Sequence, residues 1–100
     1  MAKQVSNDKQ FLVIKAPFKE FAAIGCGIGN NRGVCDYCNK PIGPDEECYY
    51  IAVLNMIKCE KCYGSWIKSA KSFVEDRPIE RRNFDSYRYQ LIARNLWNNQ

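Results

Sequence analysis

Four cysteines in two identical pairs are the residues of this sequence with the clearest chemistry. Cys35 and Cys38 form the first C-x-x-C pair, and Cys59 and Cys62 form the second after twenty intervening residues. One such pair places two sulfurs about 2.3 Å from a common point, and a second pair completes a tetrahedral shell around zinc. The spacing C-x2-C-x20-C-x2-C therefore predicts one structural Zn²⁺ held by these four thiolates.

Other chemistry for the same cysteines is less well supported. Reduced thiols or disulfides are the simplest alternative, but paired cysteines in a reducing compartment more often mark a metal or redox site. A thioredoxin-like site uses one pair after a strand in a βαβ unit, which this pattern lacks. An iron–sulfur cluster or a rubredoxin-like iron centre takes the same four thiolates and stays open.

Two further cysteines lie outside the pairs. Cys26 and Cys48 are expected to be small buried side chains, because free cysteine is among the most buried residue types. Cys26 lies in a glycine-rich segment, where it could instead replace a ligand or be oxidised.

The composition is that of a soluble globular protein, with 46% hydrophobic and 26% charged residues among 100. Its longest apolar runs, FLVI and YYIAVL, are far shorter than the roughly 18 residues that cross a bilayer. The polar start MAKQVSNDKQ lacks the apolar region of a signal peptide. We expect a cytoplasmic protein without membrane association, folded as a single domain over residues 1–100, with residues 1–9 flexible.

Apolar periodicity predicts the elements before and between the cysteine pairs. Residues 11–14 indicate a short buried strand, residues 18–24 a short helix, and the glycine-rich residues 25–33 a loop. Residues 47–59 indicate a β-hairpin whose turn includes Asn55, a residue type that tolerates the left-handed conformation. Both faces of its first strand are mostly apolar.

Two longer helices are expected after the hairpin. Apolar side chains recur at helical spacing from Tyr63 to Val74, and this helix must end before Pro78, because proline disfavours helix at the preceding residue. A last helix over residues 84–97 has an apolar stripe, which we expect to pack on residues 11–14 and on the preceding helix. A monomer is therefore favoured, with a twofold homodimer as the alternative. The stripe consists of Phe84, Tyr87, Leu91, Ile92 and Leu96.

Residues 33–74 resemble the treble-clef zinc fingers. The resemblance rests on a knuckle (CDYC), a β-hairpin (ECYYIAVLNMIK) and a helix whose first turn holds the last two ligands (CEKCYGSWIKSAK). The start, CDYCNKPIGPDEECYYI, also looks like the opening of LIM-type modules, although ligands for the second LIM zinc are absent. In a knuckle the residue near Asn39 must relax into a left-handed conformation. The implied fold is α+β, with a strand and short helix before the treble clef and a helix after it.

Catalysis is not expected from this set of residues. The chain contains no histidine, which removes the commonest general base, and four cysteine ligands leave no open position for a catalytic water. We therefore expect a non-catalytic module with a structural zinc ion that acts as a protein-interaction adaptor. If Tyr89 and Trp97 are exposed together, they would mark an interface.

Binding to DNA or RNA is the alternative function. A net charge of +4 is too small to indicate it alone, and acidic residues interleave with the arginines. The candidate recognition residues, for nucleic acid or for a protein partner, are Lys58, Lys61, Lys68, Lys71, Arg77, Arg81, Arg82, Arg88 and Arg94.

Overall fold

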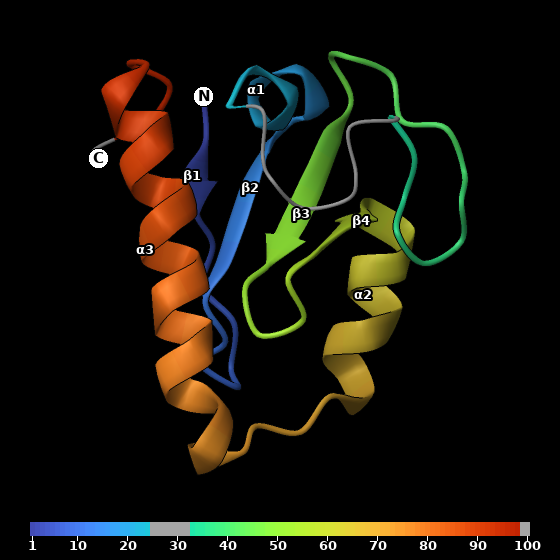
Figure 1. Cartoon of the computed structure of the whole chain (residues 1–100). Helices are drawn as coiled ribbons and strands as arrows, with labels where there is room; N and C mark the ends of the chain where they lie inside the picture. The colour runs from blue at the N-terminus through green and yellow to red at the C-terminus, as the bar shows by residue number, and fades with distance from the viewer. Residues whose placement is uncertain (25–32, 99–100) are drawn as a thin grey trace.

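Four antiparallel strands, in the order β1-β2-β3-β4, form the centre of the fold in the computed structural model, which describes residues 1–24 and 33–98 (Figure 1). The chain is a single α+β domain, as the sequence predicts. The strands are β1 (Lys3–Gln4), β2 (Val13–Pro17), β3 (Glu47–Ile51) and β4 (Met56–Cys59). The helices are α1 (Phe18–Ala23), α2 (Glu60–Ser69), the 3-10 turn η1 (Val74–Asp76) and α3 (Arg77–Ala93).

Helices cover both faces of the sheet, with α3 on one side and α2 on the other (Figure 1). Successive strand residues point to opposite faces. Ile14, which pairs with Tyr50 across β2 and β3, therefore belongs to the core under α3. Val13 and Tyr49 belong to the core under α2. The apolar character of both faces of β3, visible in the sequence, follows from this double coverage.

Helix α3 is attached to the sheet by polar contacts as well as by its apolar stripe. The buried carboxylate of Glu80 accepts a hydrogen bond from the backbone N–H of Leu12 at 2.9 Å. Asn83 donates to the carbonyl oxygen of Ala52 at 3.0 Å. The stripe packs within the chain, as expected, but against the α1 side of the sheet and not against α2, because the sheet separates the two helices.

Aromatic contacts form most of the core beneath α2. The rings of Tyr49 and Tyr63 stack with centroids 4.2 Å apart. Phe11, which precedes β2, lies 4.8 Å from Trp66 between ring centroids. Aromatic pairs of this kind add to the stabilisation from burial alone. These ring contacts hold α2 to the sheet, although no residue of α2 is fully buried.

Helix α2 is shorter than its apolar pattern predicts. It ends at Ser69 and not near Val74, and Ala70 is already extended at φ −67° and ψ 144°. The ammonium of Lys9 donates to the carbonyl oxygens of Lys68 at 3.0 Å and Ala70 at 2.8 Å. These are carbonyls that a helix end leaves without partners, so a cation from the N-terminal segment completes the terminus.

Helix α3 begins earlier than predicted and also ends earlier. Pro78 lies in its first turn, where the missing N–H costs nothing, so the helix starts at Arg77 and not at residue 84. At the other end Asn95 is left-handed at φ 60°. Asn95 N–H donates to the carbonyl of Ile92 and Leu96 N–H to that of Leu91. This Schellman pair stops the helix before residue 97.

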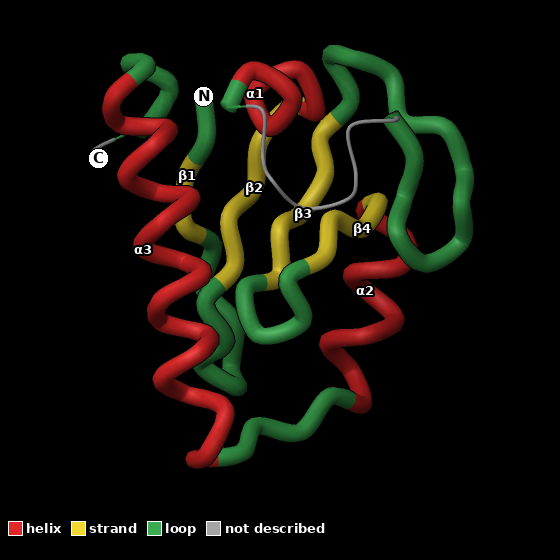
Figure 2. The backbone as a smooth tube through the Cα atoms, viewed as in Figure 1, coloured by secondary structure: helices red, strands yellow, loops and turns green. Residues whose placement is uncertain are grey.

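Residues 1–9 were expected to be flexible, but the structure ties them to the fold. Ala2 is fully buried and bridges to Trp97, with hydrogen bonds from Ala2 N–H to Leu96 and from Asn98 N–H to Ala2. The polar composition of this segment hid the role of β1 as an edge strand. The connection from α2 to α3 runs along the end of the molecule opposite both termini (Figure 2).

The remaining predicted elements agree with the structure in kind. The strand predicted over residues 11–14 is β2, which runs over Val13–Pro17. The carbonyl of Leu12 still accepts a hydrogen bond from Ala52 N–H at 3.2 Å. The hairpin forms, and Asn55 is left-handed at φ 54°. The glycine-rich segment and Cys26 fall in residues 25–32, outside the described residues. Within residues 1–24 and 33–98 no helix is both long and apolar enough to cross a membrane.

Leu91 and Ile92 offer a matched test of the α3 contact. Leu91 is fully buried and Ile92 is 39% exposed. We expect Leu91→Ala to lower the free energy of unfolding by about 2–5 kcal/mol, since it leaves a cavity. Ile92→Ala should cost much less. Urea unfolding of the two metal-loaded variants measures both values, and equal losses would contradict this packing of α3.

Candidate metal centre

The first cysteine pair lies in a tight turn whose backbone is fully used. Asn39 N–H donates to the carbonyl oxygen of Cys35 at 3.0 Å, and Cys35 N–H donates to that of Lys40 at 2.9 Å. Asn39 is left-handed at φ 61°, as expected for the residue that reverses a knuckle, and asparagine adopts this conformation at low cost. The turn over residues 35–38, called the knuckle below, therefore aims both of its cysteines inward.

The knuckle is attached to β4 through Asp36. Its backbone N–H donates to the carbonyl oxygen of Ile57 at 2.8 Å, and its carboxylate accepts from Ile57 N–H at 2.8 Å. These two bonds place the knuckle beside the strand that ends in Cys59. They fix the distance between the two cysteine pairs without any contact through the sulfurs.

The second pair spans the junction between β4 and α2. Cys59 is the last residue of β4 and the N-cap of α2, and Cys62 lies in the first turn of the helix. Two residues three apart on a helical turn present their side chains on the same side. The positive end of the helix also favours thiolates at this position.

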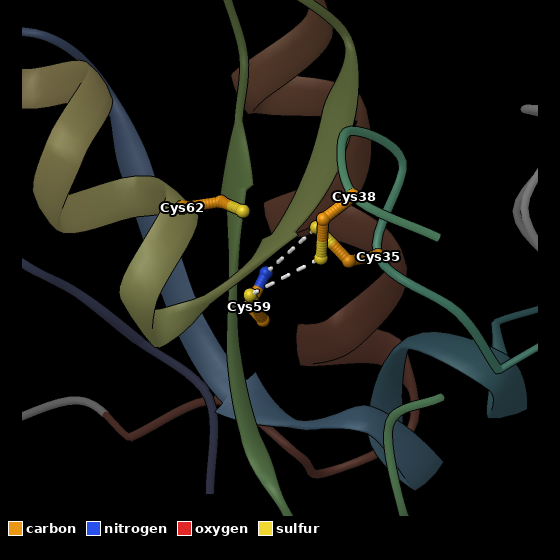
Figure 3. A group of neighbouring side chains, drawn as sticks. All are labelled: Cys35, Cys38, Cys59 and Cys62. Carbon is orange, nitrogen blue, oxygen red and sulfur yellow. Dashed lines mark hydrogen bonds between the residues drawn. The ribbon is translucent and has the colours of Figure 1, made fainter. Parts of the chain in front are cut away.

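The four sulfur atoms converge from the knuckle, the end of β4 and α2 (Figure 3). All lie within 4.8 Å of one another, and the sulfurs of Cys38 and Cys59 are 3.9 Å apart. A tetrahedron with metal–sulfur bonds of about 2.3 Å has sulfur–sulfur edges of about 3.8 Å. The predicted ligands Cys35, Cys38, Cys59 and Cys62 are therefore brought to distances that fit one tetrathiolate-bound metal ion.

Backbone donors lower the pKa of the Cys35 thiol. Burial opposes its ionisation, but hydrogen bonds from backbone N–H groups of Cys38, Cys59 and Tyr37 outweigh burial and lower the pKa to about 7. The bonds from Cys59 and Tyr37 are 3.3 and 3.4 Å long. Thiolate sulfur in metal sites is commonly stabilised by outer donors of this kind.

The pKa of Cys62 is shifted in the opposite direction. Burial and hydrogen bonding with the sulfurs of Cys59, Cys38 and Cys35 raise its pKa to about 12. Once one thiolate exists, a second negative charge a few ångström away is disfavoured. A divalent cation removes this conflict, because it is the counter-charge that lets several thiolates share one shell.

The candidate recognition residues do not form one surface. The lysines of α2 and the arginines of α3 lie on opposite sides of the sheet (Figure 1). Lys58 differs from expectation, since it is only 4% exposed, because β4 is covered by α2 on the face to which Lys58 points. The other eight are exposed at the surface: Lys61, Lys68, Lys71, Arg77, Arg81, Arg82, Arg88 and Arg94.

Several of these arginines already have contacts within the chain. Arg81 forms an ion pair with Asp85 at 3.3 Å, and Arg88 lies 5.4 Å from the ring centroid of Trp97. Trp97 itself is 9% exposed whereas Tyr89 is 73% exposed. The two aromatic side chains are therefore not exposed together and do not form the interface that joint exposure would have marked.

Cys48 is a core residue, as the sequence suggested. It is fully buried, its sulfur donates weakly to the carbonyl oxygen of Ala16 at 3.5 Å, and burial raises its pKa to about 12. Such a thiol is unreactive at neutral pH. The sulfur cluster found within the described residues contains the four paired cysteines and not Cys48.

Tyr37 is a surface residue of the site that the sequence patterns did not single out. It is 70% exposed on the outside of the knuckle, and the ammonium of Lys58 lies 4.3 Å from its ring centroid. Position between the two cysteines does not by itself identify Tyr37, because Asp36 has the same place and its carboxylate instead bonds β4. Tyr37 and Lys58 line a groove beside the metal site.

The fold and site together define a small α+β protein with a candidate four-cysteine metal centre. No protein-family model matches the chain, and neither a curated protein nor a solved structure matched it in comparison. The functional interpretation therefore depends on the geometry.

Two cysteine substitutions separate a ligand from a core residue. Cys62→Ser should abolish tight metal binding and lower the melting temperature strongly, because three thiolates hold the ion poorly. Cys48→Ala should keep one metal ion per chain and cost about 1–2 kcal/mol. Elemental analysis and thermal denaturation measure both. Equal metal content in the two variants would exclude Cys62 as a ligand.

The raised pKa of Cys62 predicts proton release when metal binds. At pH 7.5 its thiol is protonated in the metal-free protein, whose Cys62 pKa is about 12, and a bound metal requires the thiolate. Lowering the pH should therefore weaken metal binding. Calorimetry in two buffers of different ionisation enthalpy should give different apparent binding enthalpies. Identical values would show that no proton leaves.

Proposed function

We propose that this protein is a non-catalytic protein-interaction module built on a treble-clef zinc finger with one structural Zn²⁺. The proposal is supported by the order of the elements along the chain: the knuckle, the β3–β4 hairpin, and α2 with a ligand in its first turn. This is the order that the resemblance implies. The zinc ligands would be Cys35, Cys38, Cys59 and Cys62.

Zinc is the ion proposed, because two C-x-x-C pairs at this spacing are typical of structural zinc sites. Elemental analysis distinguishes it from iron, which takes the same four thiolates. Zinc binding contributes about 10–16 kcal/mol in small finger peptides, which is comparable to the whole stability of a typical domain. In this chain the ion would connect the knuckle and α2 to the sheet.

Exposed apolar side chains on the α2–α3 connection and in the first turn of α3 carry the proposal of a protein partner. Phe73 is 52% exposed, Val74 82% and Ile79 52%. The early end of α2 removes Phe73 and Val74 from the core in which their spacing would have placed them. Apolar residues gathered in one exposed segment are characteristic of contact surfaces. We therefore infer that a partner protein covers this connection.

A partner test uses variants of the connection and a matched aromatic control. Phe73→Ser combined with Val74→Ser should greatly reduce partner capture by the immobilised zinc-loaded protein. Tyr89→Ser removes a ring that is even more exposed, at 73%, on α3 and should leave capture intact. Both variants should keep their zinc and melting temperature. Unchanged capture by the double variant would exclude the connection as the contact surface.

Nucleic-acid binding is tested in parallel. A nucleic-acid binder should be retained on heparin, with an affinity that falls steeply with salt and is weakened by Lys68→Glu or Arg82→Glu. The protein module proposed here should show little retention, since its cations lie on both sides of the sheet.

A further inference from the structure

A groove of about 460 Å³ lies beside the candidate metal centre, between the knuckle, the end of β4 and α2. Its volume falls within the range of pockets that accept a few side chains or a small ligand. Its walls combine two aromatic rings, two lysines and two serine hydroxyls. The lining residues are Tyr37, Lys58, Lys61, Cys62, Ser65, Trp66 and Ser69.

Lys58 is the residue of this groove whose state needs an explanation. It is 4% exposed, yet among residues 1–24 and 33–98 its ammonium forms neither an ion pair nor a hydrogen bond. Its contact is with the face of the Tyr37 ring, at 4.3 Å from the centroid. The carbon stem of Lys58 is buried, while its ammonium opens to the groove, as long lysine side chains commonly do. Without an acidic partner among the described residues, this ammonium is available to an anion that enters the groove.

The thiolates are the obvious internal candidates for that anion, since four of them around Zn²⁺ carry a net charge of −2. The ammonium of Lys58 makes no hydrogen bond to any of the four sulfurs, and the backbone N–H groups of Tyr37 and Cys59 both donate to Cys35. It points to the groove with Tyr37, together with the exposed Lys61. The negative charge of a zinc-loaded site would attract both lysines, but the donors of Lys58 stay directed to the groove.

We propose that this groove binds an acidic peptide segment of the partner, with a carboxylate side chain placed between Lys58 and Lys61. Hydroxyls of Ser65 and Ser69 are available as further donors to the same carboxylate. An apolar side chain next to it in the peptide packs against Tyr37 and Trp66, which provide the non-polar walls. This inference rests on the proposed function and names the chemistry of the partner.

The arrangement of charge favours a peptide over a nucleic acid. A nucleic-acid strand needs a row of cations that follows its backbone. Here the two groove lysines are set apart by the sheet from the arginines of α3. Two cations and an aromatic wall within one small groove fit one or two carboxylates and a neighbouring apolar residue.

The test measures fluorescence anisotropy of a labelled peptide, EEFEE, added to the full zinc-loaded chain. We expect saturable binding, and binding weaker by about tenfold or more for the uncharged peptide QQFQQ. Lys58→Gln should weaken EEFEE binding by a similar factor. Lys3→Gln is the control, because Lys3 is exposed on β1 outside the groove, and it should bind as the unchanged protein does.

Zinc content of each variant is measured alongside binding. If Lys58→Gln loses zinc, Lys61→Gln at an exposed position tests the same groove, and normal peptide binding by it would overturn the proposal. Equal binding of EEFEE and QQFQQ, or binding of single-stranded oligothymidylate in place of EEFEE, would also overturn it. If partner capture is lost in the Phe73 and Val74 variant but unchanged in Lys58→Gln, this inference fails while the proposed function stands.

Discussion

Four cysteine sulfurs gathered within 4.8 Å are the constraint on which the rest of the structure depends, because they cannot all ionise there without a counter-charge. In the metal-free protein the raised pKa of Cys62 keeps that thiol protonated, whereas a divalent cation at the centre would let all four thiolates form. The knuckle is also held independently of the sulfurs, since the backbone and the carboxylate of Asp36 each form a hydrogen bond with Ile57.

The sheet divides the molecule into two cores that differ in how they are built. Under α3, fully buried side chains such as Phe84 and Leu91 pack with the sheet in the usual way. Under α2, partly exposed rings such as Tyr63 and Trp66 stack on the sheet, and no residue of the helix is fully buried. The second core is thin, and it is the one next to the candidate metal centre. A metal ion bound at Cys62 would supplement this weak packing.

The ligand set and the main elements could be predicted from the sequence because their signals are local. Two C-x-x-C pairs, an Asn at each of two left-handed positions, and alternation in residues 47–53 each depend on near neighbours. The wrong predictions, on the end of α2 and on residues 1–9, concern features that depend on distant parts of the chain. Lys9 ends α2 from a distant part of the chain, and a polar N-terminal segment becomes a strand only through β2 and Trp97. Distant contacts of this kind leave no periodic pattern.

The same reasoning applies within the site. The inward positions of the cysteines follow from their spacing, whereas the burial of Lys58 depends on where α2 crosses β4. A charged residue between Ile57 and Cys59 is expected at the surface from composition alone. The groove lined by Tyr37 and Lys58 therefore could not be predicted from the sequence.

The hydrogen bonds between Asp36 and Ile57 have a consequence for solubility. β4 is an outer strand of the sheet, and such a strand exposes backbone groups that can recruit strands from other molecules. The knuckle occupies part of that edge, and at the opposite edge β1 has only two residues. Loss of these hydrogen bonds would uncover that part of β4, so a chain in which they are broken would become a template for strand addition between copies.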